Sequence, residues 1–191
     1  MRITPRHMIL SCLFTALTAA GALISFPLPP FPGKVTLQIF VLVLCARVLP
    51  PFPAFLSVLA YLLLGLAGVP ILSMGGGLQY VLQPTFGYLA GFLAGAPLAS
   101  ALYRTRALRM RPVLRVVVPG AVFLLCTYGL GVPWLGFIMN GVMRTQMPWT
   151  RIIVTGCLLF LPIDAVKVAL AEPAARFIER LAGRGNLSGR P

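Results

Sequence analysis

Long apolar stretches, each bordered by proline-rich or basic segments, recur along the whole chain and limit what it can fold into. The first covers residues 8–26 and contains no charged side chain. A helix of about 20 apolar residues crosses the hydrocarbon core of a lipid bilayer, which is about 30 Å thick. Segments of this kind predict an all-α, polytopic membrane protein.

Composition supports this fold class and restricts the partners of the chain. Of its 191 residues, 59% are hydrophobic and 10% are charged, whereas soluble domains carry about 25% charged residues. A net charge of +13 would suggest nucleic acid for a soluble protein. Here the arginines lie between apolar stretches, where they meet lipid headgroups. We therefore expect a lipid bilayer, and no nucleic acid, as partner.

The apolar stretches predict six membrane-spanning helices in one domain, residues 1–191. They lie at approximately 8–26, 35–49, 54–68, 84–103, 113–130 and 150–171, and a basic tail, 172–191, follows. We expect the first span to be retained, because it is longer than the apolar region of a usual signal peptide. Six spans put both termini on one side, which holds twelve Lys and Arg residues against three opposite. That side is the cytoplasm by the positive-inside rule.

Proline, glycine and charge predict how the spans are connected and packed. Residues 27–33 form a proline-rich loop that cannot be helical, and residues 131–148 are expected to be an amphipathic linker. Lys34 and Arg47, at the two ends of the second span, are expected to extend to the membrane surface.

Small residues repeat every four positions on two predicted spans. On the fourth span the repeat comprises Gly87, Gly91 and Gly95, and it predicts close approach of a neighbouring helix. On the first span, Ala16 and Ala20 form a similar stripe. That second stripe fits either packing within the chain or docking of another membrane subunit.

Two charged residues, Asp164 and Lys167, lie deep inside the sixth predicted span. A lone charge at a helix centre costs about 2.5–3.5 kcal/mol by insertion scales, but residues three apart on a helix can pair. One interpretation is an ion pair that only fixes helix packing. The other is a binding site, since a carboxylate and an ammonium group together suit a small ligand with donors and acceptors.

Polar side chains gather on the non-cytoplasmic side of the predicted bundle. They sit at the ends of spans or in the glycine-rich connection of residues 69–83. We expect them to line the same substrate pocket as the charged pair: Gln38, Ser73, Gln79, Gln83 and Tyr88.

The sequence lacks the motifs of the common enzyme classes. It contains no GxxxxGK[ST] phosphate loop, no HExxH and no GxSxG motif. With three acidic residues and one histidine, it has too few ligands for a catalytic metal. We expect no enzyme activity, no metal and no cofactor.

Five short motifs in a fixed order resemble one family of membrane proteins. They are residues 35–38 (VTLQ), 61–70 (YLLLGLAGVP), 75–77 (GGG), 84–92 (PTFGYLAGF) and 162–167 (PIDAVK). This order resembles BioY, the biotin-specific S component of energy-coupling-factor (ECF) transporters. The chain departs from the family pattern at Gln83, Phe86 and Ile163, where glycine is usual.

The resemblance implies a six-helix bundle that takes up biotin as transported ligand. It implies partners, a transmembrane coupling subunit and a pair of ABC-type ATPase subunits, with docking through Ala16 and Ala20. It also implies that Asp164 accepts from the N–H groups of biotin, while Lys167 donates to its ureido oxygen or its carboxylate. The alternatives are a carrier or S component for another small vitamin, and a membrane scaffold that transports nothing.

Overall fold

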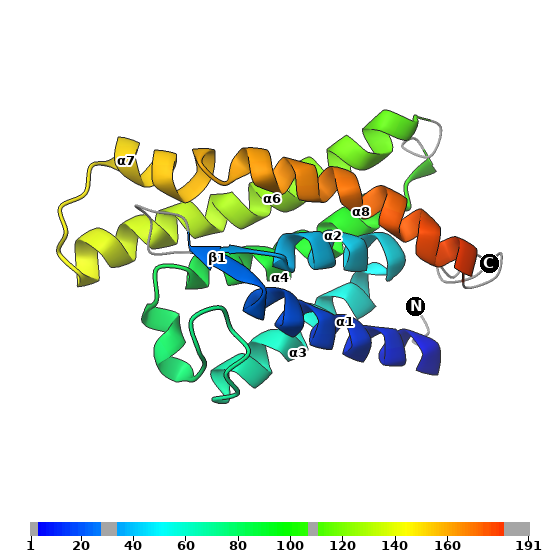
Figure 1. Ribbon diagram of the computed structural model, residues 1–191, viewed down its shortest axis with the longest axis horizontal. Coiled ribbons are helices and arrows are strands. Elements are labelled where there is room, and N and C mark those ends of the chain that lie inside the picture. The colour runs from blue at the N-terminus through cyan, green and yellow to red at the C-terminus, as the bar shows by residue number, and fades with distance from the viewer. Residues whose placement is uncertain (1–3, 28–33, 107–110, 182–191) are drawn as a thin grey trace.

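The computed structural model describes residues 4–27, 34–106 and 111–181, which form an elongated bundle of helices (Figure 1). The first half comprises α1 (Pro5–Leu23), β1 (Ser25–Pro27), β2 (Lys34–Thr36), α2 (Gln38–Val48), α3 (Pro51–Leu66) and the 3₁₀ turn η1 (Leu78–Leu82). The second half comprises α4 (Phe86–Tyr103), α6 (Pro112–Gly136), η2 (Phe137–Val142), α7 (Trp149–Ile153), η3 (Val154–Leu158) and α8 (Leu161–Leu181). α1 begins and α8 ends at the same end of the bundle.

Four helical segments are long and apolar enough to cross a membrane: Pro5–Leu23, Phe86–Tyr103, Val113–Val142 and Trp149–Ile178. The other two apolar helices, α2 and α3, are shorter, with 11 and 16 residues. At a rise of 1.5 Å per residue, α2 is about 16 Å long, roughly half the hydrocarbon core. The mostly helical fold is confirmed, while α2 alone is too short for a full crossing.

The second half of the chain is more helical than the sequence predicted. Within the expected linker, residues 131–148, α6 continues to Gly136 and is extended by the π-helical turn η2 to Val142. The expected tail begins inside α8, which continues to Leu181; the rest of that tail, residues 182–191, lies outside the described residues. The prediction missed these extensions because it ended each helix where an average span would end.

A small β-hairpin borders the loop predicted at residues 27–33, whose first residue, Pro27, belongs to its first strand. β1 and β2 pair antiparallel, with Ser25 opposite Thr36 and Pro27 opposite Lys34. Residues 28–33, between the strands, lie outside the described part. The Leu37 backbone N–H donates to the Gly21 carbonyl, so the hairpin is fixed against the end of α1.

The glycines of α4 bring it into contact with α6, as the four-residue repeat predicted. A Cβ added to Gly91 would lie 2.5 Å from Thr127 Cα, and one added to Gly87 would lie 2.3 Å from Trp134 Cβ. Distances below 3.0 Å leave no room for any side chain. The backbones of the two helices therefore pack directly against each other.

Hydroxyl groups join α1 to α3 on the face of α1 opposite the alanine stripe. Ser11 Oγ donates to the Pro53 carbonyl and Thr15 Oγ1 to the Ser57 carbonyl, both at 2.9 Å. Ala16 and Ala20 are exposed. The alanine stripe therefore lies on the outer surface of the bundle in this chain.

A second ion pair is buried near the end of the bundle where α1 begins and α8 ends. Arg47 Nε donates to Glu172 Oε2 at 3.0 Å, with the two side chains 6% and 5% exposed. Arg176 Nε donates to the other oxygen, Oε1, at 2.9 Å, and the guanidinium of Arg47 lies 5.8 Å from the ring centre of Tyr103. The expectation that Arg47 extends to the membrane surface is wrong, because Glu172 gives it a buried partner.

We predict that Gly91→Ala destabilises the bundle by about 1–3 kcal/mol, the usual cost of overpacking. The added methyl group would overlap Thr127 and force α4 away from α6. Gly129→Ala is the matched control, since a Cβ there meets nothing within 4 Å. Thermal unfolding of the detergent-solubilised protein measures both variants. Equal melting temperatures for Gly91→Ala and the unsubstituted chain would contradict direct packing at this seam.

We predict that Glu172→Gln destabilises the protein by about 3–5 kcal/mol, because it leaves the charge of Arg47 buried without its carboxylate. Arg176→Gln removes the other cation from the same carboxylate. The Arg176 side chain is 52% exposed, so its loss is expected to cost about 0–1 kcal/mol. The same thermal assay compares them. If the two variants have the same melting temperature, the Arg47–Glu172 contact adds nothing to stability beyond the contact of Glu172 with Arg176.

Candidate functional site

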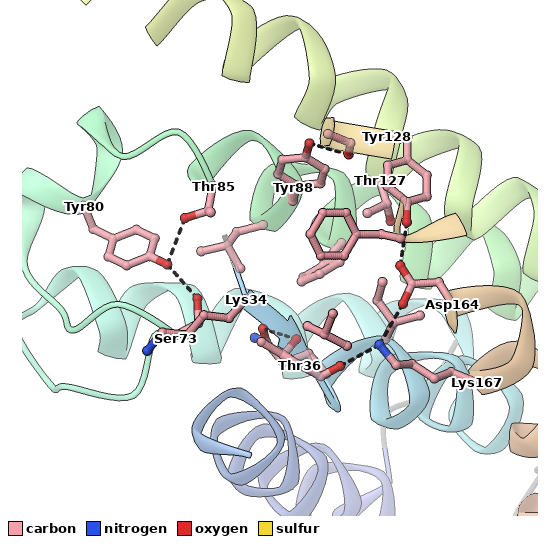
Figure 2. Close-up of a pocket in the computed structure, with 17 residues that line it drawn as sticks. Lys34, Thr36, Ser73, Tyr80, Thr85, Tyr88, Thr127, Tyr128, Asp164 and Lys167 are labelled. Atoms are coloured by element: carbon pink, nitrogen blue, oxygen red, sulfur yellow. Dashed lines mark hydrogen bonds and ion pairs between the residues drawn. The ribbon is translucent and has the colours of Figure 1, made fainter. Parts of the chain in front are cut away.

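A cavity of about 610 Å³, counted with the open space at its mouth, lies between the hairpin and helices α2, α4, α6 and α8. Its lining combines apolar side chains with polar and charged ones (Figure 2). The apolar lining comprises Val35, Ile39, Leu89, Phe92 and Phe160.

Asp164 and Lys167 both line this cavity. Lys167 Nζ donates to Asp164 Oδ1 at 2.7 Å and to the Thr36 carbonyl at 2.8 Å. Tyr128 Oη donates to the other carboxylate oxygen, Oδ2, at 2.5 Å. Asp164 is 3% exposed. The pair therefore faces a void in the bundle and is tied to β2 and α6, as Figure 2 shows.

Three hydroxyl groups form a second polar group in the same cavity. Ser73 Oγ lies 3.1 Å from Tyr80 Oη, which in turn lies 3.2 Å from Thr85 Oγ1. Gly75 and Gly77, with φ of +116° and +100°, allow the chain to turn back between Ser73 and Tyr80 in a conformation that favours glycine. The glycine-rich connection of residues 69–83 therefore positions two of these hydroxyls.

Gln38 lines the cavity, but the protein itself holds its amide. Its Nε2 donates to Tyr61 Oη at 2.8 Å, and Thr36 Oγ1 donates to its Oε1 at 3.1 Å. Tyr61 Oη donates onward to the Ile71 carbonyl at 3.1 Å. Gln38 is 3% exposed. This chain of hydrogen bonds fixes the hairpin and the loop after α3 relative to each other.

Tyr88 also lines the cavity, and its hydroxyl donates to the Gly156 carbonyl at 2.6 Å. Gly156 lies in the π-helical turn η3. The Tyr88 ring meets the Tyr128 ring edge-on, with centres 6.1 Å apart. Tyr88 therefore presents its ring to the cavity and joins α4 to the broken helix that precedes α8.

The structure does not bring Gln79 and Gln83 to the cavity. Gln79 is exposed and its Nε2 donates to the Gly76 carbonyl at 2.7 Å. The backbone carbonyl of Gln83 accepts from Trp134 Nε1 at 3.2 Å. Both residues flank Tyr80 in sequence, but the η1 turn points Tyr80 inward, where it is 2% exposed.

Several lining residues were not predicted as site residues from the sequence. Tyr128 had no local signal, because it is one aromatic residue in an apolar helix. Lys34 was assigned to the membrane surface, yet it lines the cavity from β2. Tyr80 and Thr85 lie within or beside the quoted motifs. In the described part of the chain, no group of three His, Cys, Asp or Glu side chains could hold a metal ion.

Comparison with known proteins identifies the family to which this chain belongs. The model of the BioY family matches residues 1–184. The chain belongs to the BioY family. The resemblance that the five motifs predicted is thereby confirmed.

Named BioY proteins match nearly the whole chain. A probable biotin transporter BioY of Lysinibacillus sphaericus is 34% identical over 174 residues, covering 91% of this chain and 85% of that protein. The biotin transporter BioY of Thermotoga maritima is 34% identical over 177 residues, covering 92% and 97%. A solved S-component for biotin from an ECF-type ABC transporter superposes with a TM-score of 0.82 at 23% identity, covering 97% of each chain. That likeness shows that the two chains share one fold.

Proposed function

We propose that this chain is the biotin-binding S component of an ECF-type transporter. The observation that carries the proposal is the cavity with its buried Asp164–Lys167 pair, held by Tyr128 and the Thr36 carbonyl. Relatives that span the same length are named biotin transporters. The solved chain of the same fold is an S-component for biotin.

The hydrogen-bonding capacity of the pair matches the ureido ring of biotin. Each oxygen of Asp164 accepts one bond from the protein and retains lone pairs for a ligand N–H. Lys167 donates two of its three hydrogens, one to Asp164 and one to the Thr36 carbonyl, which leaves one for a carbonyl oxygen. The apolar walls suit the fused rings and the aliphatic tail.

The proposed setting is a bacterial cell (inner or plasma) membrane, crossed six times with both termini in the cytoplasm. α1 begins and α8 ends at the same end of the bundle, as an even number of crossings requires. Among the described residues, the start of α1, the end of α4, the start of α6 and the end of α8 lie at that end and carry arginines, in line with the positive-inside rule. α2 and the hairpin together would complete the second crossing.

The proposed partners are a transmembrane coupling subunit and ABC-type ATPase subunits. The chain has no phosphate-binding loop, so a partner would supply ATP hydrolysis, and the chain would act as a carrier and not as an enzyme. Ala16 and Ala20 are exposed along α1, and small residues let a partner helix approach closely. This exposure supports α1 as the docking helix.

We predict that Asp164→Asn weakens biotin binding about 10- to 100-fold, the effect of losing a hydrogen bond to a charged group. Gln79→Ala is the matched control, because Gln79 is exposed and outside the cavity. Isothermal titration of the purified proteins with biotin gives both affinities. Unchanged biotin affinity in Asp164→Asn would leave the ion pair with a packing role only.

We predict that a thiol-reactive, membrane-impermeant reagent labels Gln79→Cys in intact spheroplasts, but labels Arg106→Cys only after permeabilisation. Both positions are exposed. Gln79 belongs to η1 and Arg106 follows α4, and these two segments lie at opposite ends of the bundle. The four native cysteines are first replaced by alanine, which leaves one thiol in each variant. Labelling of both positions from the outside would rule out the proposed orientation.

A further inference from the structure

Two exposed arginines stand where α4 ends and α6 begins, far from the cavity. Arg106 follows α4, and Arg111 immediately precedes α6. Both helix ends lie at the end of the bundle where α1 begins and α8 ends (Figure 1). Five positions apart, the two residues have Cα atoms within about 18 Å of each other, so their long side chains can converge on one ligand.

The arginine nearest to them in the described chain has a structural role instead. Arg104 Nη1 donates to the Ser100 carbonyl at 2.8 Å, and its Nη2 donates to the Val48 carbonyl at 3.2 Å. Arg104 thereby joins the end of α4 to the end of α2. Among the described residues, neither Arg106 nor Arg111 has a hydrogen-bond or ion-pair partner. Their guanidinium groups therefore remain available to a ligand.

The helices that carry these two arginines supply no counter-charge of their own. The first 163 residues contain no acidic side chain. The three acidic residues of the chain all lie on α8, where Asp164 lines the cavity and Glu172 is buried against Arg47. An anion from outside the chain is the counter-charge that suits Arg106 and Arg111.

The surface that adjoins Arg111 along α6 is apolar. Val113 and Val117, one helical turn apart, are 70% and 53% exposed. They begin the segment Val113–Val142, which is long and apolar enough to cross a membrane. A ligand at this place meets guanidinium groups and exposed apolar side chains together. Phospholipids have that chemistry, with a phosphate at one end and acyl chains at the other, whereas a small soluble anion has only the first.

From this combination we infer that Arg106 and Arg111 bind the headgroup of an anionic phospholipid, whose acyl chains lie along the start of α6. A guanidinium group binds phosphate oxygens through two parallel hydrogen bonds. A zwitterionic headgroup would bring its own cation next to the arginines, whereas phosphatidylglycerol brings none. Each arginine near an anionic lipid surface strengthens binding about 3- to 5-fold. In the proposed orientation the lipid belongs to the cytoplasmic leaflet.

The test measures how tightly the detergent-solubilised full chain binds single lipids, by native mass spectrometry with phosphatidylglycerol and with phosphatidylcholine. We expect the unsubstituted chain to bind phosphatidylglycerol about 10- to 25-fold more tightly. The double variant R106Q/R111Q is expected to lose this preference, and R106K/R111K, which keeps both charges, to retain most of it. Arg151→Gln is the matched control, because Arg151 is an exposed arginine on α7 at the other end of the bundle. It is expected to change the preference less than 2-fold.

Equal affinity of the unsubstituted chain for the two lipids would overturn the inference, as would an equal loss of preference in Arg151→Gln. Inorganic phosphate is added as a competitor. If it displaces phosphatidylglycerol at similar concentration, the site binds a free anion and not a lipid, which also overturns the inference. An unchanged melting temperature of R106Q/R111Q shows that its fold is kept. Failure of the unsubstituted chain to bind biotin would refute the proposed function alone, because the lipid site lies outside the cavity.

Discussion

The Asp164–Lys167 pair is the interaction on which the arrangement around the cavity depends. Two charges inside an apolar bundle need partners, because an unpaired charge in hydrocarbon costs several kcal/mol. Each finds a partner on a different element: Asp164 accepts from Tyr128 of α6, and Lys167 donates to the backbone of β2 at Thr36. The pair therefore holds the hairpin against α8 and positions Tyr128 at the cavity. The polar atoms that line the cavity are therefore the same atoms that hold the hairpin, α6 and α8 together.

The remainder of the bundle keeps this polar site apart from the opposite end. Glycines let α4 and α6 meet backbone to backbone, which leaves no gap between them along that seam. Farther along α8, Glu172 binds Arg47 of α2, so the two helices that flank the cavity are joined again below it. Since breaking a buried pair is costly, these contacts favour a bundle that stays closed at this end. Direct packing between α4 and α6 and the buried ion pair between α2 and α8 both hold the helices together.

The sequence alone predicted the family, the apolar helices and the charged residues at the cavity. It did not predict which side chains the buried charged residues contact. Helix length and the small-residue repeat are local properties, so residues such as Gly91 could be interpreted correctly from spacing. The Arg47–Glu172 contact joins residues 125 apart, and no local pattern indicates it. Tyr128 was missed because a membrane helix is apolar on every face, so hydrophobic periodicity cannot tell which side faces a cavity. Gln79 was misplaced because η1 decides which of its residues points inward.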